Sequence, residues 1–138
     1  MQFEKHVYET MILEHHLDSF GHVNNATYLE ILEEARWDFI TKRGYGYKEV
    51  HEKKIGPTIL EINIKFRREL LLRQTIRIES KITAYDGKVG KLTQEIKSEA
   101  GDVHCIAEFT VGLFDIRARR LIAPTPEWLH AVGLAQDK

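Results

Sequence analysis

Apolar residues recur at spacings of three and four from Asn25 to about Arg43, which is the periodicity of a buried helix. The apolar positions are Tyr28, Leu29, Ile31, Leu32, Ala35, Phe39 and Ile40, and the narrower polar stripe is Glu30, Glu33, Glu34, Asp38 and Thr41. Asn24 or Asn25 can cap the start of this helix, while Lys42 and Gly44 are typical of its end. We therefore predict one long helix that other parts of the structure surround.

Most of the remaining chain alternates between apolar and polar residues, which predicts β-strands. The apolar face is Leu60, Ile62, Ile64 and Phe66 in residues 59–68, and Ile76, Ile78, Ile82 and Ala84 in residues 75–85. Residues 85–88 (YDGK) predict a hairpin turn, because Asp-Gly tolerates positive φ, and residues 89–100 predict a third strand. A fourth strand carries Cys105, Ala107, Phe109, Val111 and Leu113 on one face. Residues 6–16 are extended, although their alternation is less regular.

The order of a strand, a helix and four strands with short turns predicts an α+β domain built on an antiparallel sheet. The length of 138 residues favours a single domain, 1–138, and the 43% hydrophobic and 30% charged content is ordinary for a globular protein. The net charge of −1 gives no reason to expect nucleic acid or a membrane as partner. One cysteine cannot form an internal disulfide, and the first residues lack a signal-peptide pattern, so the expected location is the cytoplasm.

Residues 18–36, DSFGHVNNATYLEILEEAR, place an acid, a histidine and two asparagines where the long helix is predicted to begin. Such a turn either caps the helix or forms an active site that uses the positive end of the helix dipole. The pattern D-x-x-G-H-V-N-N-x-x-Y, the helix that follows with its Ala35-Arg36, the four strands and a late Thr125-Pro126 resemble the hotdog-fold acyl-CoA thioesterases. More narrowly, the chain resembles their 4-hydroxybenzoyl-CoA thioesterase-like branch over about residues 5–130.

This resemblance implies a hotdog fold, in which a curved antiparallel β-sheet is wrapped around one long central α-helix. It also implies a homodimer whose sheets join edge to edge with active sites at the interface, or a homotetramer of such dimers. The implied reaction is hydrolysis of an acyl-CoA or acyl-carrier-protein thioester, with no cofactor other than the coenzyme A of the substrate. A hotdog dehydratase or hydratase and a non-catalytic acyl-CoA-binding protein remain the alternatives, because a fold does not determine a function.

For the site, the resemblance implies that the backbone amide of Asn25 stabilises the oxyanion at the positive end of the helix. Asp18 is implied to act as nucleophile or general base, and His22 to orient Asp18 or the bound thioester. The alternatives are an Asx turn of Asp18 with the next two residues, and a purely structural contact of His22 in the loop. We expect the side chains of Asn24 and Asn25 to act mainly as helix caps.

The motif departs from one related branch at a single position. Plant acyl-carrier-protein thioesterases have an asparagine two residues after the aspartate, where this chain has Phe20, so a catalytic acid without an asparagine partner is favoured. Another hotdog branch takes its carboxylate from within the helix, and Glu33 or Glu34 could then replace Asp18. The alternative for both glutamates is a solvated or ion-paired helix face.

Candidate substrate-binding residues follow from the chemistry of coenzyme A and of the acyl group. Tyr28, with Leu32 and Phe66, is expected to close the acyl tunnel, and Arg67 and Arg68 can hold phosphates. Further basic candidates are Arg73, Arg117, Arg119 and Arg120. An ordinary charged sheet face is the alternative for any single arginine.

No metal site is expected. His15, His16, Asp18 and His22 could imitate one, but alternation along a strand would place His15 and His16 on opposite faces, and no ligand spacing matches a known site. Cys105 lies in an apolar alternating strand and is predicted to belong to the core. The two tryptophans, Trp37 and Trp128, are predicted to be packing residues.

Overall fold

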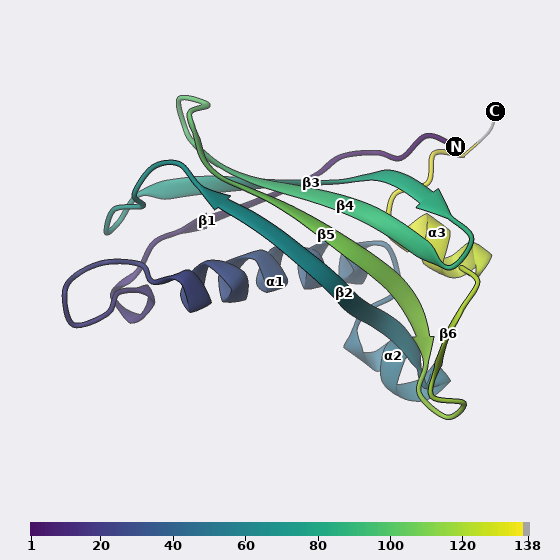
Figure 1. Cartoon of the computed structure of the whole chain (residues 1–138). Helices are drawn as coiled ribbons and strands as arrows, with labels where there is room; N and C mark the ends of the chain where they lie inside the picture. The colour runs from purple at the N-terminus through teal and green to yellow at the C-terminus, as the bar shows by residue number, and fades with distance from the viewer. Residues whose placement is uncertain (137–138) are drawn as a thin grey trace.

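The computed structural model describes residues 1–136 and shows a curved antiparallel sheet with three α-helices (Figure 1). In chain order the elements are β1 (His6–Met11), a 3₁₀ helix (Glu14–His16), α1 (Asn25–Lys42), α2 (Tyr47–Lys53), β2 (Ile55–Phe66), β3 (Thr75–Asp86), β4 (Val89–Ser98), β5 (Val103–Asp115), β6 (Arg120–Ile122) and α3 (Pro126–Ala131). None of the described helices is both long enough and apolar enough to cross a membrane.

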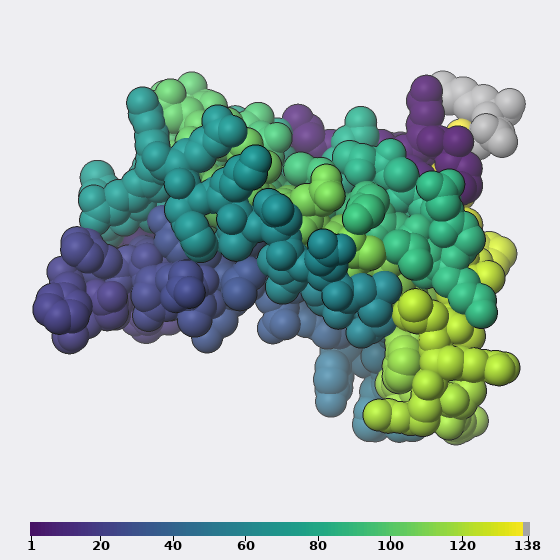
Figure 2. Space-filling view, in the orientation of Figure 1, coloured from purple at the N-terminus to yellow at the C-terminus, as the bar shows by residue number. Residues whose placement is uncertain are grey.

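The strands run antiparallel in the order β1–β3–β4–β5–β2, and β6 pairs with β5. The antiparallel pairing agrees with the short turns expected from the sequence. The long strands curve together over α1, which lies along one face of the sheet (Figure 1). Because β2 is last in the order, one of its edges has no partner strand within the described residues. Its side chains lie on the side of the molecule that the space-filling view presents (Figure 2).

Helix α1 begins at the residue where the sequence places its start and has 18 residues. Its buried positions are Tyr28, Ile31, Leu32, Ala35, Phe39 and Ile40, all of them members of the predicted apolar set. Glu30, Glu33 and Glu34 of the polar stripe are exposed. The apolar side of α1 is therefore the side that packs on the sheet.

Two β-bulges change which residues face the core. In β2, Ile59 pairs with Val111 and Glu61 with Thr110, so the residue between them has no partner in β5. In β3 a similar shift lies between Ile82 and Ala84. The extra residue reverses the alternation of side chains. The prediction that Leu60 and Ala84 face the core was therefore wrong: both are exposed, and Ile59 and Tyr85 pack against the core in their place.

The N-terminal segment also differs from the prediction. Strand β1 ends at Met11, and residues 14–16 form a 3₁₀ helix instead of continuing the strand. The alternation argument does not apply there, and the rings of His15 and His16 lie side by side, with centroids 4.0 Å apart. Helices α2 and α3 were not predicted, since seven and six residues are too few to show a helical period.

A buried polar group connects α1 to the sheet. Gln94 of β4 is fully buried, and its side-chain amide donates to the Leu32 carbonyl at 3.1 Å and to Ser80 Oγ at 3.0 Å. Its Oε1 accepts a hydrogen bond of 3.0 Å from Arg36 Nη1. The guanidinium of Arg36 lies 4.5 Å from the ring centroid of Phe109, and burial lowers the pKa of Arg36. These contacts fix the position of α1 relative to β3 and β4.

Candidate active site

The turn before α1 is closed by both the backbone and the side chain of Asp18. Its N–H donates to the carbonyl of His22 at 2.8 Å, and its carbonyl accepts from the N–H of Gly21 at 3.0 Å. Its Oδ1 accepts from the backbone amides of Phe20 at 2.9 Å and His22 at 3.0 Å. Gly21 has a φ of +77°, which favours glycine at this position. Asp18 thus forms an Asx turn, and within residues 1–136 no group donates a hydrogen bond to its second oxygen.

The first turn of α1 leaves backbone amides available. Asn24 is the cap: its Oδ1 accepts from the Thr27 amide at 3.0 Å, and its carbonyl accepts from the Tyr28 amide at 3.2 Å. Within residues 1–136 the amides of Asn25 and Ala26 have no acceptor. Free amides at a helix N-terminus carry partial positive charge, so this end of α1 can bind a developing oxyanion.

An open groove of about 450 Å³ lies beside these amides. Its lining residues are His22, Val23, Asn25, Tyr28, Phe66, Arg67, Arg68 and Glu69. The rings of Tyr28 and Phe66 meet edge to face with centroids 4.8 Å apart, so α1 and β2 together form an aromatic wall. Burial raises the pKa of Tyr28, which keeps this phenol neutral at physiological pH.

The groove brings together most of the residues singled out in the sequence. His22, Asn25, Tyr28, Arg67 and Arg68 all line it. Asp18 is not among the lining residues, although it shapes the turn that carries His22. The carboxylate of Asp18 therefore does not line the groove. It is connected to the groove through the turn that carries His22.

Glu69 is a lining residue that the sequence did not single out. Its Oε1 lies 3.6 Å from Nε2 of His22, and both side chains are exposed. The two residues that precede it are held by the start of β5, since the amides of Arg67 and Arg68 both donate to the carbonyl of His104. The only signal in the sequence was its position directly after two arginines at the end of a predicted strand.

Other candidates lie away from the groove. Arg73 is paired with Glu14 at 2.7 Å, and Arg117, Arg119 and Arg120 are in or beside the β5–β6 turn, at the far end of the molecule from the start of α1 (Figure 1). Glu34 accepts a hydrogen bond of 2.7 Å from the hydroxyl of Tyr8. The buried Cys105 belongs to the core as predicted, and burial raises the pKa of its thiol to about 11.

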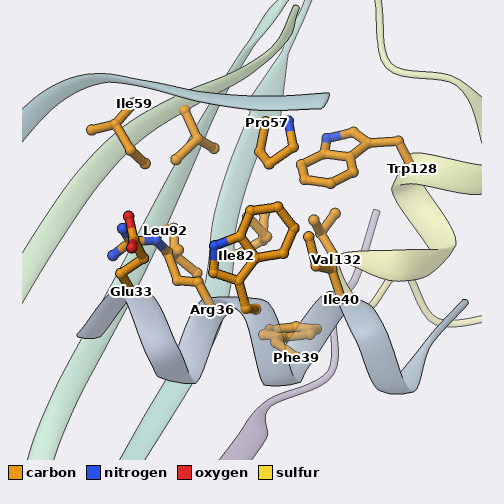
Figure 3. Close-up of a pocket in the computed structure, with 12 residues that line it drawn as sticks. Glu33, Arg36, Phe39, Ile40, Pro57, Ile59, Ile82, Leu92, Trp128 and Val132 are labelled. Carbon is orange, nitrogen blue, oxygen red and sulfur yellow. The ribbon is translucent and has the colours of Figure 1, made fainter. Parts of the chain in front are cut away.

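A second cavity, of about 130 Å³, lies between the C-terminal half of α1 and the sheet (Figure 3). It is lined by Glu33, Arg36, Trp37, Phe39, Ile40, Pro57, Ile59, Ile82, Leu92, Val111, Trp128 and Val132. The two charged residues lie together at one end in Figure 3, and Trp128 lies at the other. Glu33, one of the alternative catalytic acids, therefore belongs to this cavity and not to the groove.

A curved antiparallel sheet over one helix, with a groove at the helix N-terminus, is the architecture of the hotdog class. The family model of the thioesterase-like superfamily matches residues 12–132. The long-chain acyl-CoA thioesterase FadM of Escherichia coli is 36% identical over 110 residues, which cover 79% of this chain and 83% of that protein. The chain therefore belongs to the thioesterase-like superfamily, and the predicted enzyme class, a thioester hydrolase, is confirmed.

Solved structures agree with this assignment. The probable thioesterase YbaW from Escherichia coli superposes with a TM-score of 0.78 and 32% identity, covering 91% of this chain and 94% of that chain. The protein SAV2348 from Staphylococcus aureus, whose structure was solved in complex with CoA, has a TM-score of 0.85 with 20% identity, covering 96% of this chain and 84% of that chain. At that identity the second likeness shows the shared fold alone.

Proposed function

We propose that this protein hydrolyses acyl-CoA thioesters to a free acid and coenzyme A, with no other cofactor. The observation that carries the proposal is the groove beside the free amides of Asn25 and Ala26 at the start of α1. The similarity to a protein named as a long-chain acyl-CoA thioesterase supports acyl-CoA as the substrate class. Carrier-protein thioesters are the second substrate to test.

In the proposed reaction, the amide of Asn25 donates to the thioester oxygen as the tetrahedral intermediate forms. A water oxygen becomes bonded to the acyl carbon, the carbon–sulfur bond breaks, and a proton reaches the departing thiolate. A preorganised donor of this kind typically contributes roughly 100–1000-fold to the rate. The aromatic wall formed by Tyr28 and Phe66 would keep part of the reacting group away from water.

Asp18 is the proposed carboxylate, acting either as nucleophile or as general base for water. One of its oxygens already holds the turn through the amides of Phe20 and His22. The other oxygen would act on the substrate, which must then enter the groove from the side of the turn. His22 lines the groove and is proposed to orient the thioester, with Glu69 nearby to orient its ring.

The direct test is release of free thiol from a panel of acyl-CoAs by the wild-type protein and by Asp18→Asn. Asparagine retains an Oδ1 that can accept from Phe20 and His22, so the turn should persist while the charge is lost. We expect kcat to fall by about 100-fold or more. Normal turnover by the folded variant would show that Asp18 only shapes the turn. Hydration of an enoyl-CoA without thiol release would instead indicate a hydratase.

The roles of His22 and Glu69 can be separated by kinetics. His22→Gln should lower kcat if the ring orients the reacting group, and Glu69→Gln should have a smaller effect of the same kind. Arg67 and Arg68 are proposed to hold coenzyme A phosphates, so Arg67→Gln should raise KM for acyl-CoA with little change for a short thioester that lacks the nucleotide. An equal effect on both substrates would contradict the phosphate contact.

We also propose that the protein forms a homodimer, or a homotetramer of dimers, through the free edge of β2. Three large apolar side chains of this strand are exposed in the single chain: Leu60 at 47%, Ile62 at 43% and Phe66 at 49%. An apolar strand edge without a partner favours pairing with a second strand. Light scattering after gel filtration should give at least twice the monomer mass, and Leu60→Lys should shift it toward the monomer. A monomeric wild-type protein at micromolar concentration would refute the interface.

A further inference from the structure

Both tryptophans of the chain line the cavity between α1 and the sheet, and apart from Glu33 and Arg36 its walls are apolar or aromatic (Figure 3). We propose that this cavity receives the methyl end of a long acyl chain whose thioester lies at the start of α1, and that Trp128 closes it and sets the upper limit of chain length. The inference rests on the proposed acyl-CoA hydrolysis, because that places the thioester at Asn25.

The bulge in β2 places apolar side chains between the groove and the cavity on one side of the strand. Before the bulge, Pro57 and Ile59 line the cavity, and after it Phe66 lines the groove. Because the extra residue reverses the alternation, Ile62 and Ile64 point to the same side of β2 as these three. This side of β2 faces α1, and Ile62 is 43% exposed between the two hollows. An alkyl chain lying along this side of β2 would cover apolar side chains and would pass Glu33 and Arg36 where it enters the cavity.

The distance along α1 sets the length of acyl chain that this arrangement accepts. Helices rise about 1.5 Å per residue, so Glu33 lies about 12 Å and Ile40 about 22 Å along the axis from Asn25. An extended alkyl chain advances about 1.25 Å per carbon, since bonds of about 1.5 Å follow a zigzag. About ten carbons would therefore reach the charged end of the cavity, and about eighteen its far end.

The volume of the cavity limits how many further carbons it can hold. Benzene occupies an apolar cavity of about 150 Å³, so the 130 Å³ here would hold roughly five or six carbon atoms. Adding these to the ten needed to reach the cavity gives an acyl chain of about sixteen carbons. This length lies between the near and far ends of the cavity, and chains of eight carbons or fewer would end before it.

Trp128 is held firmly enough to act as a fixed end wall. It is 2% exposed, its Nε1 donates to the hydroxyl of Tyr85 at 3.1 Å, and its ring meets the ring of Tyr45 at 5.5 Å. Its backbone amide donates to the capping hydroxyl of Thr125 at 3.2 Å, which fixes the first turn of α3. A longer chain would have to displace this indole and break these contacts.

Binding can be tested without catalysis, because the only tryptophans of the chain, Trp37 and Trp128, report on the cavity. Bromine quenches tryptophan emission at short range. A sixteen-carbon fatty acid brominated at its terminal carbon should quench strongly, whereas the same acid brominated beside the carboxylate, and an eight-carbon acid brominated at its terminal carbon, should quench weakly. Equal quenching by the two sixteen-carbon acids, or none by either, would overturn the proposal.

A kinetic test uses a matched pair of variants. Ile59→Trp fills the cavity from β2, and Ile106→Trp places the same residue on the opposite face of the sheet, where position 106 pairs with Lys65 and Glu95. Ile59→Trp should lower kcat/KM for sixteen-carbon acyl-CoA by roughly 10–100-fold and leave eight-carbon acyl-CoA within about twofold. Ile106→Trp should alter neither.

The outcomes separate this inference from the proposed function. Equal loss for both chain lengths in Ile59→Trp, with folding intact, would refute the assignment of the cavity while acyl-CoA hydrolysis stands. Absence of thiol release by the wild-type protein from every acyl-CoA would refute the proposed function, and the quenching experiment would still decide whether the cavity takes a chain end. If Ile59→Trp does not fold, the quenching experiment on the wild-type protein is decisive.

Discussion

Replacement of Gln94 by methionine should destabilise the fold by an amount that the structure allows us to work out. The side chain makes three hydrogen bonds, to the Leu32 carbonyl, Ser80 Oγ and Arg36 Nη1, and it is fully buried. Two neutral bonds contribute about 1 kcal/mol each and the bond to the guanidinium about 1.5–3 kcal/mol. Methionine has nearly the same shape and recovers about 1 kcal/mol by burying apolar atoms. The expected net loss is about 3 kcal/mol.

Thermal and urea unfolding followed by circular dichroism measure this loss. An unfolding entropy of about 2.1 cal/mol/K per residue gives roughly 0.29 kcal/mol/K for 138 residues, so a loss of about 3 kcal/mol lowers Tm by about 10 °C. Wild type and variant should be compared at one protein concentration, because association would add to apparent stability. A shift of less than about 3 °C would refute the calculation.

A double-mutant cycle with Arg36→Met isolates the charged bond. Each single variant leaves one group of the Arg36–Gln94 pair without its partner, whereas the double variant removes both groups. The double variant should therefore lose less stability than the sum of the singles, by about 1.5–3 kcal/mol. Additivity within about 0.5 kcal/mol would mean that the two side chains do not interact in solution.

Gly133→Ala should cost about 1–3 kcal/mol in urea unfolding, because φ is +97° and the new Cβ would lie 2.8 Å from the Glu4 carbonyl; an unchanged midpoint would refute this. Cys105 should not react with Ellman's reagent at pH 8 until the protein is unfolded, since burial raises its pKa to about 11; rapid labelling of the native protein would contradict the structure. A hydrogen bond from Lys97 lowers the pKa of Glu79 below its ordinary value of 4.5. The stability that this ion pair contributes is therefore present above pH 4.5 and is lost as the pH falls through the lowered pKa. Glu79→Gln should flatten the fall of Tm between about pH 6 and pH 3, and an unaltered acid slope would argue against the pair.

Local signals explain why α1 and its cap could be predicted. The spacing of apolar residues, the capping Asn24 and the short turns act over a few neighbours, and the structure places α1 where these signals indicate. The bulges were not predictable in the same way, because Leu60 and Thr83 become extra residues only through the pairing of β2 with β5 and of β3 with β4. Ala84 then loses its predicted place in the core to Tyr85.

The same distinction between local signals and tertiary packing applies to the residues of the candidate site. His22 and Asn25 could be placed together because they lie in one continuous turn, and their distance in the chain is short. Phe66 and Glu69 reach the same groove from the end of β2 through tertiary packing, and nothing in the alternation of that strand indicates that Glu69 lies 3.6 Å from His22. The cavity at Trp128 depends on α3, a helix too short to show a period.

The bulge at Leu60 also constrains how the length of this strand can change in evolution. Deletion of that one residue would restore regular pairing with β5 and would leave Ile59 opposite Val111 and Phe66 opposite Cys105. Pro57 and Ile59 would then stay in the cavity and Phe66 would stay against Tyr28, whereas loss of a paired residue elsewhere in β2 would turn one half of the strand over. Homologous enzymes should therefore lose a single residue from this strand at the bulge and not within the paired segments.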